Sequence, residues 1–381
     1  MPISDPEAVR ALPSDPAPGP SDGRNAGHDA PGAETRDRPA AGVNLTARFH
    51  AARDVRLAEE PLPKLRDGES LVEITAVGLC GSDLHWYDEG GIGDARITYP
   101  IVGGHEMAGV VRGGALDGVR VAVDPAIPCH HCDLCVAGHP NLCREIIFAG
   151  HANCDGGLQR YLAWPTARLH PLPDSLSFAD GAMLEPLGVA VHALDLGHVR
   201  LGASVAVLGC GPIGLLMIQV ARAAGAARIV AADPFPHRRA AAAARGADAV
   251  LDPSDPGYFD QLASFTAGLG VDVAFEIAGT DAAIAAAVEA ARPGGRVVLT
   301  GIPSAETSSF PASPARRKGL TFTLVRRMKE VYPRATGLVT AGLVDVRNVV
   351  SHRFPLTGVT EAFETAVARQ GLKVVVEPSR S

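Results

Sequence analysis

Four cysteines lie within one short segment of the 381-residue chain, at a spacing that suits a metal ion. The pattern is C-x2-C-x2-C-x7-C, and its members are Cys129, Cys132, Cys135 and Cys143. Four thiolates at this spacing can surround one tetrahedral Zn²⁺ at about 2.3 Å each, which leaves no position open for a substrate. Two disulfides and an iron–sulfur cluster are the alternatives. The spacing favours zinc, and a site closed by four protein ligands would be structural.

A second set of residues has the ligand types of a catalytic zinc, which keeps one coordination position open. Cys80 begins the run C-G-S-D-L-H, His105 and Glu106 follow in G-G-H-E, and Glu185 begins E-P-L. Taken singly, they have ordinary structural explanations: a buried thiol, a core histidine or a helix cap. Because the chain also contains the four-cysteine motif and a nucleotide motif, we interpret all four residues as candidate ligands of a catalytic zinc.

A glycine-rich turn follows the apolar segment 204–208 and begins a helical stretch. It reads G-C-G-P-I-G, and we expect the cofactor contacts to come from Gly209, Gly211, Ile213 and Gly214. Glycines in this context make the tight turn and let backbone N–H groups approach a pyrophosphate. Asp233 ends the next predicted strand, where its carboxylate can accept hydrogen bonds from the adenosine ribose and repel a 2′-phosphate. The pattern therefore favours NAD, while Arg238 and Arg239 keep NADP open as the alternative.

The elements that must position these residues change in character along the chain. Residues 43–187 contain short apolar strands broken by Gly and Pro, which is typical of a β-rich, partly barrel-like domain. Strands then alternate with alanine-rich helical stretches, such as 214–224 and 238–245, which indicates a parallel sheet. We predict strands of that sheet at 204–208, 228–232, 249–251, 271–277, 296–300 and 320–325. The closing segment, 351–377, has the pattern strand, helix, strand and fits either domain on pattern alone.

Composition and charge exclude several classes of protein. The formal net charge of −7 lacks the basic excess that phosphate binding needs, so we expect no nucleic-acid partner. No apolar run reaches the roughly 18 residues of a membrane span, so we expect no membrane partner either. Residues 1–42 are rich in Pro, Ala, Asp and Gly, which predicts a disordered tail and not a secretory signal. We therefore expect a cytoplasmic protein whose seven cysteines stay reduced.

The chain resembles the zinc-containing medium-chain dehydrogenases/reductases, and most closely the branch of sorbitol (L-iditol), xylitol and related polyol dehydrogenases. The resemblance extends over residues 43–377, and it rests on the motifs above together with D-G-G at 155–157, H-R-F-P-L at 352–356 and E-A-F-E at 361–364. It implies an α/β fold, with a GroES-like, β-rich catalytic domain at 43–188 and 326–381. A Rossmann doubly wound parallel-sheet domain at 189–325 would bind NAD. It also implies a homo-oligomer, either a tetramer or a dimer.

The same resemblance implies a mechanism. NAD would place its nicotinamide beside the zinc that Cys80 and His105 hold, and the metal would lower the pKa of a substrate hydroxyl. Ser82 would take the hydroxyl proton and His85 would pass it to solvent. Hydride would then move from the carbinol carbon to the nicotinamide. Arg326 matches a family arginine near the cofactor and the substrate hydroxyls.

The expected substrate is a small-molecule alcohol, namely a polyol or sugar-like compound with a secondary hydroxyl that is oxidised to a ketone. In the simple-alcohol branch of the family, a cysteine corresponds to Glu185, so the glutamate points away from simple alcohols. The sequence does not decide whether Glu106 or Glu185 contacts the zinc directly. Idonate, threonine and butanediol dehydrogenases share most of these motifs and remain alternatives, as does a non-catalytic zinc-stabilised binding protein.

Two residues depart from the polyol pattern. Trp86 stands where polyol members often have a substrate-contacting tyrosine, although Tyr87 follows it. Arg327 stands where another tyrosine is expected. An extra positive charge at this position would fit an acidic sugar such as idonate, whereas an arginine turned to solvent would leave the substrate unaffected.

Overall fold

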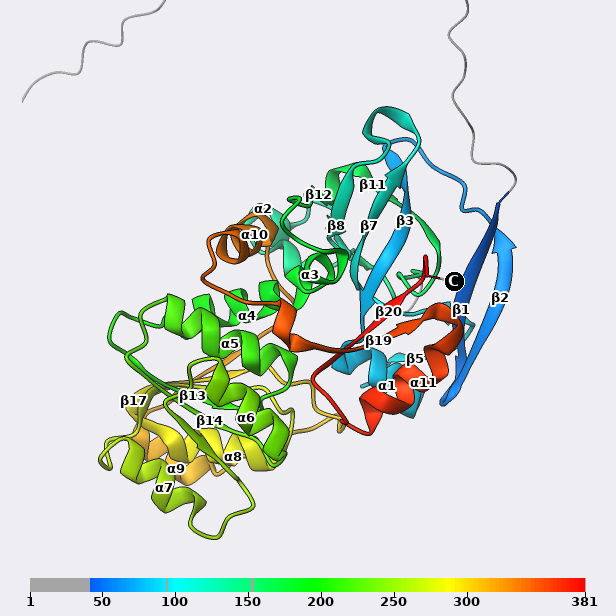
Figure 1. The fold of residues 1–381 in the computed structure, drawn as a ribbon. Coiled ribbons are helices and arrows are strands. Elements are labelled where there is room, and N and C mark those ends of the chain that lie inside the picture. The colour runs from blue at the N-terminus through cyan, green and yellow to red at the C-terminus, as the bar shows by residue number, and fades with distance from the viewer. Residues whose placement is uncertain (1–41, 94, 152–153, 381) are drawn as a thin grey trace, which may run out of the picture. The chain divides into compact units, whose positions relative to one another are not determined.

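A mostly antiparallel sheet of seven strands supports the first set of motifs. The computed structural model describes residues 42–93, 95–151 and 154–380, so the predicted disordered tail lies outside the described residues, apart from residue 42. The sheet has the order β12-β8-β7-β3-β20-β19, with β11 paired to β3 (Figure 1). Its strands are β3 (Glu69–Gly78), β7 (Glu106–Arg112), β8 (Arg120–Val123), β11 (Tyr161–Pro165), β12 (Leu169–Pro171), β19 (Val350–Pro355) and β20 (Lys373–Glu377).

Smaller strand groups and short helices surround this sheet. One group has the order β2-β1-β6, and β4 pairs with β5 as β9 does with β10. Their bounds are β1 (Val43–Ala51), β2 (Asp54–Pro61), β4 (Gly91–Ile92), β5 (Ala95–Arg96), β6 (Ile101–Val102), β9 (Ala126–Ile127) and β10 (Ile147–Phe148). The helices of this part are α1 (Gly81–Glu89), α2 (Asp133–Val136), α3 (Phe178–Ala182) and α11 (Val359–Val367), with 3-10 turns η1 (Gly114–Leu116), η2 (Pro140–Leu142), η3 (Thr166–Arg168), η4 (Arg347–Val349) and η5 (Leu356–Gly358).

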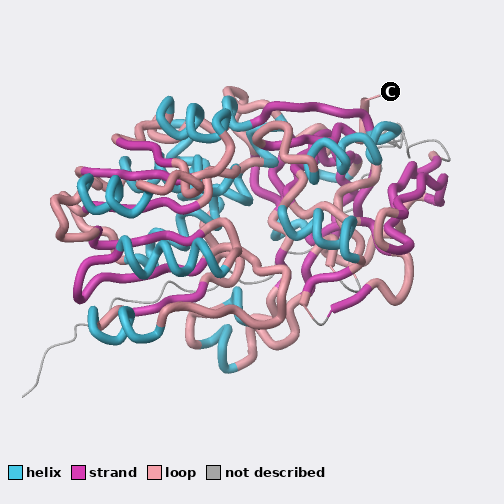
Figure 2. The backbone as a smooth tube through the Cα atoms, turned by 90° about the horizontal axis from the view of Figure 1, so that it is seen from below, coloured by secondary structure: helices cyan, strands magenta, loops and turns pink. Residues whose placement is uncertain are grey.

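A parallel sheet forms the middle of the chain, as predicted. Its order is β15-β14-β13-β16-β17-β18, and helices lie along its strands (Figure 2). The strands are β13 (Ser204–Leu208), β14 (Arg228–Ala232), β15 (Ala249–Leu251), β16 (Val271–Glu276), β17 (Ala291–Leu299) and β18 (Thr321–Leu324). The helices are α4 (Leu184–Gly197), α5 (Pro212–Ala223), α6 (Pro236–Ala244), α7 (Tyr258–Phe265), α8 (Asp281–Ala290), α9 (Ala312–Lys318) and α10 (Tyr332–Thr340).

Both faces of the parallel sheet are buried, which explains why its strands read as continuous apolar runs. In β13, Val205 and Val207 belong to one hydrophobic cluster with residues of α4 and α5. The alternate residues Ala206 and Leu208 belong to another cluster, together with residues of α7 and α8. Two-sided burial with helices on each face is the doubly wound arrangement, so the predicted α/β fold class is confirmed.

Element boundaries differ from the sequence prediction at a few places. Strand β17 begins at Ala291, five residues before the predicted 296, because Ala291 pairs with Val271 ahead of a register shift. Helix α5 begins at Pro212, since a proline in the first turn gives up an N–H that has no helical partner there. Among the described residues, no helix has the length and apolar character that crossing a bilayer requires.

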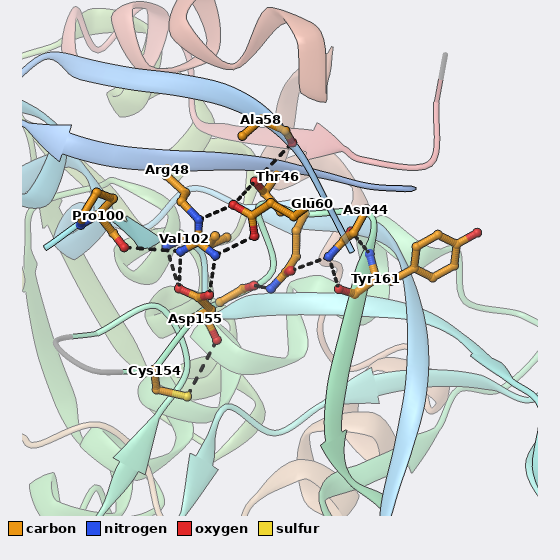
Figure 3. A network of polar contacts seen from close by, with 12 residues as sticks. Asn44, Thr46, Arg48, Ala58, Glu60, Pro100, Val102, Cys154, Asp155 and Tyr161 are labelled. Carbon is orange, nitrogen blue, oxygen red and sulfur yellow. Dashed lines mark hydrogen bonds and ion pairs between the residues drawn. The ribbon is translucent and has the colours of Figure 1, made fainter. Parts of the chain in front are cut away.

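The loop 155–158 packs directly against the turn that precedes His105. Asp155 Oδ1 accepts a hydrogen bond from Val102 N at 3.0 Å, and Arg48 binds Asp155 and Glu60 together (Figure 3). The backbone N–H groups of residues 156–158 donate to the carbonyls of residues 102–104, at 2.7 to 3.0 Å. The D-G-G motif thus forms a backbone-to-backbone contact that fixes the turn at Gly103 and Gly104.

We expect Gly156→Ala to lower the free energy of unfolding by about 1–3 kcal/mol, because a methyl group there overpacks the contact. A Cβ at this position would lie 2.2 Å from the carbonyl oxygen of Gly104. Denaturant unfolding measures the effect. Gly337→Ala is the matched control, since a Cβ there meets nothing within 4 Å and the residue lies in α10, where alanine stabilises by about 0.5–1 kcal/mol. Equal stability of Gly156→Ala and the wild type would contradict this account of the motif.

Candidate active site and metal centres

The four predicted cysteines of the closed site converge around a single point. Their Sγ atoms all lie within 4.8 Å of one another, and Cys132 Sγ is 4.0 Å from Cys143 Sγ. Tetrahedral zinc with bonds of about 2.3 Å requires sulfur atoms about 3.8 Å apart, so the group fits the ion. All seven cysteines of the chain are free thiols, and the disulfide alternative has no support.

Backbone donors favour ionised sulfur in this loop. Cys132 N donates to Cys129 Sγ, and Cys129 N donates to Cys143 Sγ, each at 3.3 Å. Backbone N–H groups of Cys135 and Arg144 lower the pKa of Cys132 to about 6. Burial and the neighbouring thiols raise the pKa of Cys135 to about 12. A bound Zn²⁺ would balance the charge of the cysteine thiolates in this group.

The open site forms where two antiparallel strands end side by side. Cys80 is the N-cap of α1, two residues beyond β3, and Glu106 is the first residue of β7. The register pairs Gly78 of β3 with Glu106 of β7, which brings Cys80 next to His105. Ligand atoms of Cys80, His105 and Glu106 lie within 4.8 Å of one another. This Cys, His and carboxylate set leaves a coordination position for substrate, as a catalytic zinc requires.

Glu106 is held by a lysine that sequence reasoning missed. Lys373 Nζ donates to Glu106 Oε1 at 2.7 Å and Oε2 at 2.6 Å, and also to the carbonyl oxygen of Leu79 at 3.0 Å. Both charged side chains are buried. Each carboxylate oxygen retains a further lone pair, so the ion pair is compatible with metal ligation. A charged residue at the start of the apolar run V-V-V was the available signal, since such a charge is buried only when it is paired.

Asp83 is a second residue that sequence reasoning missed. Its Oδ2 accepts a hydrogen bond from Cys80 N at 2.9 Å, and its Oδ1 accepts one from Gly104 N at 3.1 Å. The same Oδ1 lies 3.5 Å from Nδ1 of His105. A carboxylate beside one ring nitrogen orients the imidazole and leaves the other nitrogen for a metal. The aspartate three residues after Cys80, in the first turn of α1, was the available signal.

Glu185 lies near this group but outside the set of three. It occupies the first turn of α4 and is buried. Burial, opposed by the charge of His105 and reinforced by that of Glu106, raises its pKa to about 7. Because both residues act on it electrostatically, the Glu185 carboxylate lies in their neighbourhood. Its role as a direct ligand stays a prediction.

Ser82 and His85 both lie on α1, three residues apart and therefore on the same side of the helix. Nδ1 of His85 lies 2.8 Å from Glu89 Oε1, one turn further along. Within the described residues, the Ser82 hydroxyl has no hydrogen-bond partner and does not bond to His85. The proton relay through these two side chains stays a prediction.

The glycine turn has the shape that a dinucleotide requires. Gly209 has φ +105°, in the left-handed region, and a Cβ on Gly214 would lie 1.9 Å from the carbonyl oxygen of Gly209. A Cβ on Gly211 would meet only Arg238 Nη1, at 3.8 Å, so this position is open for a close approach by phosphate. Ile213 lies in the first turn of α5, whose N-terminus favours an anion.

Asp233 connects the end of β14 to the glycine turn. Its Oδ2 accepts a hydrogen bond from Cys210 N at 2.9 Å, and its Oδ1 accepts one from Phe235 N at 2.9 Å. Arg238 lies 3.8 Å away, and its buried Nε has no partner among the described residues. Arg239 forms an ion pair with Asp252 at 2.9 Å, so it is already neutralised. Each Asp233 oxygen retains a further lone pair, so the roles of Asp233 toward the ribose hydroxyls and of Arg238 toward the cofactor stay predictions.

The two arginines after β18 differ in their environment. Arg326 is exposed, and its carbonyl oxygen accepts a hydrogen bond from Asn141 Nδ2 at 2.9 Å. Within the described part of the chain, its side chain forms no hydrogen bond or ion pair with the glycine turn, so its cofactor role stays a prediction. Arg327 is half-buried and lies over the Phe148 ring, 4.1 Å from its centroid. The interpretation of Arg327 as an arginine turned to solvent is therefore wrong.

The parallel-sheet fold and the two thiolate-containing sites define the class of zinc-dependent, nucleotide-linked dehydrogenases. Residues 66–174 match the alcohol dehydrogenase GroES-like domain, and residues 212–341 match the zinc-binding dehydrogenase domain. Sorbitol dehydrogenase of Homo sapiens is 36% identical over 342 residues, which are 88% of this chain and 96% of that protein. The chain belongs to the zinc-dependent medium-chain dehydrogenase/reductase family and is an alcohol dehydrogenase in the broad sense.

Solved structures agree with this assignment. L-idonate 5-dehydrogenase from Escherichia coli K-12 MG1655 is 30% identical, with a TM-score of 0.82 over 88% of this chain and 98% of its own. A protein described as a short chain alcohol dehydrogenase from Escherichia coli CFT073, solved with NADH, is 27% identical, with a TM-score of 0.80 over 88% and 100%. Zinc and a nicotinamide dinucleotide are the cofactors of this chain.

We expect the purified protein to contain two zinc ions per chain, one in each site. Cys132→Ser should lose one ion and lower the melting temperature, because the closed site ties a loop together. Cys80→Ser should lose the other ion and the activity while the fold remains. Cys154→Ser is the matched control, since Cys154 belongs to neither group and should retain both ions. Metal analysis that finds one zinc ion, or an iron chromophore, would contradict the two-site assignment.

Asp233→Asn should weaken the use of NAD⁺ and raise the ratio of NADP⁺ to NAD⁺ specificity constants by roughly tenfold or more, because a like charge near the 2′-phosphate is removed. Steady-state kinetics with both cofactors measure the ratio. Asp117→Asn, in a surface turn, serves as the control. A wild-type preference for NADP⁺ would show that Arg238 governs the site instead.

Proposed function

We propose that the enzyme oxidises a secondary hydroxyl of a polyol or sugar-like substrate to a ketone and transfers hydride to NAD⁺. The observation that carries this proposal is the open site of Cys80, His105 and Glu106, with the buried carboxylate of Glu185 close enough to interact electrostatically with His105 and Glu106. A site with one thiolate and several carboxylate oxygens is harder than one with two thiolates. It therefore suits an oxygen-rich substrate that can offer a second hydroxyl. The relation to sorbitol dehydrogenase supports the same substrate class.

The residues of the chain supply positioning and a proton path. Bound zinc would act as a Lewis acid that lowers the pKa of the substrate hydroxyl. Asp83 orients the His105 ring, and Lys373 fixes the carboxylate of Glu106. Ser82 would accept the hydroxyl proton, and His85, supported by Glu89, would release it to solvent.

We further propose that NAD is preferred over NADP. The support is the buried carboxylate of Asp233 at the end of β14, while Arg239 is engaged by Asp252. An acid at this position accepts the ribose hydroxyls and repels a 2′-phosphate.

We also propose that the chain has two domains and forms a homo-oligomer. Strands β19 and β20 join the sheet of β3 and β7, which supports a catalytic domain of residues 43–188 and 326–381 around a nucleotide domain of 189–325. Strand β18 is an edge of the parallel sheet, and Leu324 on it is exposed. Unpaired edges with exposed apolar side chains favour pairing with another chain, which supports a homo-oligomer.

We expect polyols and sugar acids to exceed L-threonine and 2,3-butanediol by at least about tenfold in kcat/KM, or about 1.4 kcal/mol of transition-state discrimination. NADH absorbance across a panel of sorbitol, xylitol, L-idonate, L-threonine and 2,3-butanediol measures this. The Cys80→Ser variant gives the background without the catalytic ligand. The proposal fails if threonine or butanediol is the preferred substrate by a similar factor.

A further inference from the structure

The side chain of Arg327 lies beside the open metal site. Its guanidinium lies 4.1 Å from the centroid of the Phe148 ring, and that ring is 5.3 Å from the ring of His105. One aromatic ring therefore separates the arginine from a candidate zinc ligand. The backbone of Arg327 has φ +54°, in the left-handed region that a non-glycine residue rarely adopts. Such strained positions concentrate at ligand sites, where the surrounding structure holds them.

The charge of Arg327 has no partner within the described residues. Its Nη1 is buried and has no hydrogen-bond partner, and its guanidinium forms no ion pair. Burial lowers the pKa of Arg327 to about 10, so the group stays charged at neutral pH. An unpaired cation that is partly removed from water is unfavourable, and proteins normally pair it or bind an anion there.

Among the described residues, no carboxylate lies within hydrogen-bond distance of Arg327. His151 packs edge-on against Trp86, at 5.4 Å between ring centroids. Burial, followed by the charges of Arg327 and Arg326, lowers the pKa of His151 to about 4, so this ring is neutral at neutral pH. Glu185 is the carboxylate that acts electrostatically on Arg327, but the two side chains do not form an ion pair. Arg327 and the Phe148 ring thus form a wall of the site whose positive charge has no ion-pair partner among the described residues.

We propose that Arg327 binds the carboxylate of the substrate, and that the substrate is a sugar acid of the aldonate class. This inference rests on the proposed function, because it names the substrate of the same site. A planar guanidinium suits a carboxylate, which it can bind through two parallel hydrogen bonds. The carboxylate itself does not react. A secondary carbinol carbon of the substrate gives a hydride to NAD⁺, and the hydroxyl on that carbon gives a proton. The products are the keto acid, NADH and H⁺.

Two other substrates fit the site less well. A sugar phosphate carries up to two negative charges and is usually bound by several cationic or hydrogen-bond-donating groups. Arg327 supplies only one guanidinium, which matches the single charge of a carboxylate. An amino acid such as threonine adds an ammonium group, which Arg326 and Arg327 would repel. Both compounds serve as arms of the test.

The experiment compares a six-carbon aldonate with the hexitol that differs from it only at C1, where CH₂OH replaces the carboxylate. The wild-type enzyme should favour the aldonate by at least roughly tenfold in kcat/KM. In Arg327→Gln, the ratio of aldonate to hexitol kcat/KM should fall by roughly 10- to 100-fold, since a charge-assisted hydrogen bond is lost. Arg327→Lys, which retains the charge, should recover part of the ratio. Arg317→Gln on α9 is the exposed control and should leave the ratio unchanged.

Every other outcome overturns either the role of Arg327 or the proposed function. If the wild-type kcat/KM for the hexitol equals that for the aldonate, the proposed function stands and the role of Arg327 is overturned. If Arg327→Gln lowers both activities equally, Arg327 acts on Glu185 and not on the substrate, and the inference is also overturned. A preference for the hexitol phosphate or for L-threonine overturns it as well. If zinc-loaded protein that binds NADH oxidises neither hexitol nor aldonate, the proposed function itself fails. The melting temperature with NAD⁺ and aldonate gives a second reading, because a bound ligand stabilises the wild type more than Arg327→Gln.

Discussion

The buried ion pair between Lys373 and Glu106 is the interaction on which the open metal site depends. Lys373 Nζ binds both oxygens of Glu106 and the carbonyl of Leu79, so one ammonium group ties together the ends of β20, β7 and β3. Removing one partner of such a pair leaves an uncompensated buried charge, which destabilises by about 3–5 kcal/mol. The pair also explains why the end of the chain returns to this sheet. Without β20, the carboxylate beside His105 would lose its lysine partner.

Around this pair, the site is assembled from the first residues of two strands and from the turns at strand ends. The register of β3 and β7 sets Cys80 next to His105, and Gly78 leaves room for Glu106, since a Cβ there would lie 2.1 Å from Oε2. The loop 155–158 holds the turn before His105 through three backbone hydrogen bonds. Rigid strands fix the ligand positions, whereas the turns leave one side of the metal accessible to substrate.

Chemistry and specificity are encoded by different parts of this structure. The candidate zinc ligands and the glycine turn carry the chemistry of hydride transfer, and they are held by buried side chains, namely Lys373, Asp83 and Asp233. The wall formed by Phe148 and Arg327 beside His105 is set by side chains alone. Tyr87 takes no part in it, because its ring stacks on Phe363 in the core, with centroids 4.7 Å apart. Substitutions in such a wall change the substrate without disturbing the metal.

The sequence by itself determined the fold class, the four-cysteine site and the glycine turn, because each depends on residues that are neighbours along the chain or on strand and helix periodicity. It also identified Cys80, His105 and Glu106 by ligand type. Only the tertiary structure decided that Lys373 pairs with Glu106, that Asp83 orients His105, that Glu185 lies outside the group of three, and that Arg327 turns inward. These contacts join side chains brought together by sheet register and loop packing, and local sequence patterns contain no information on such distances.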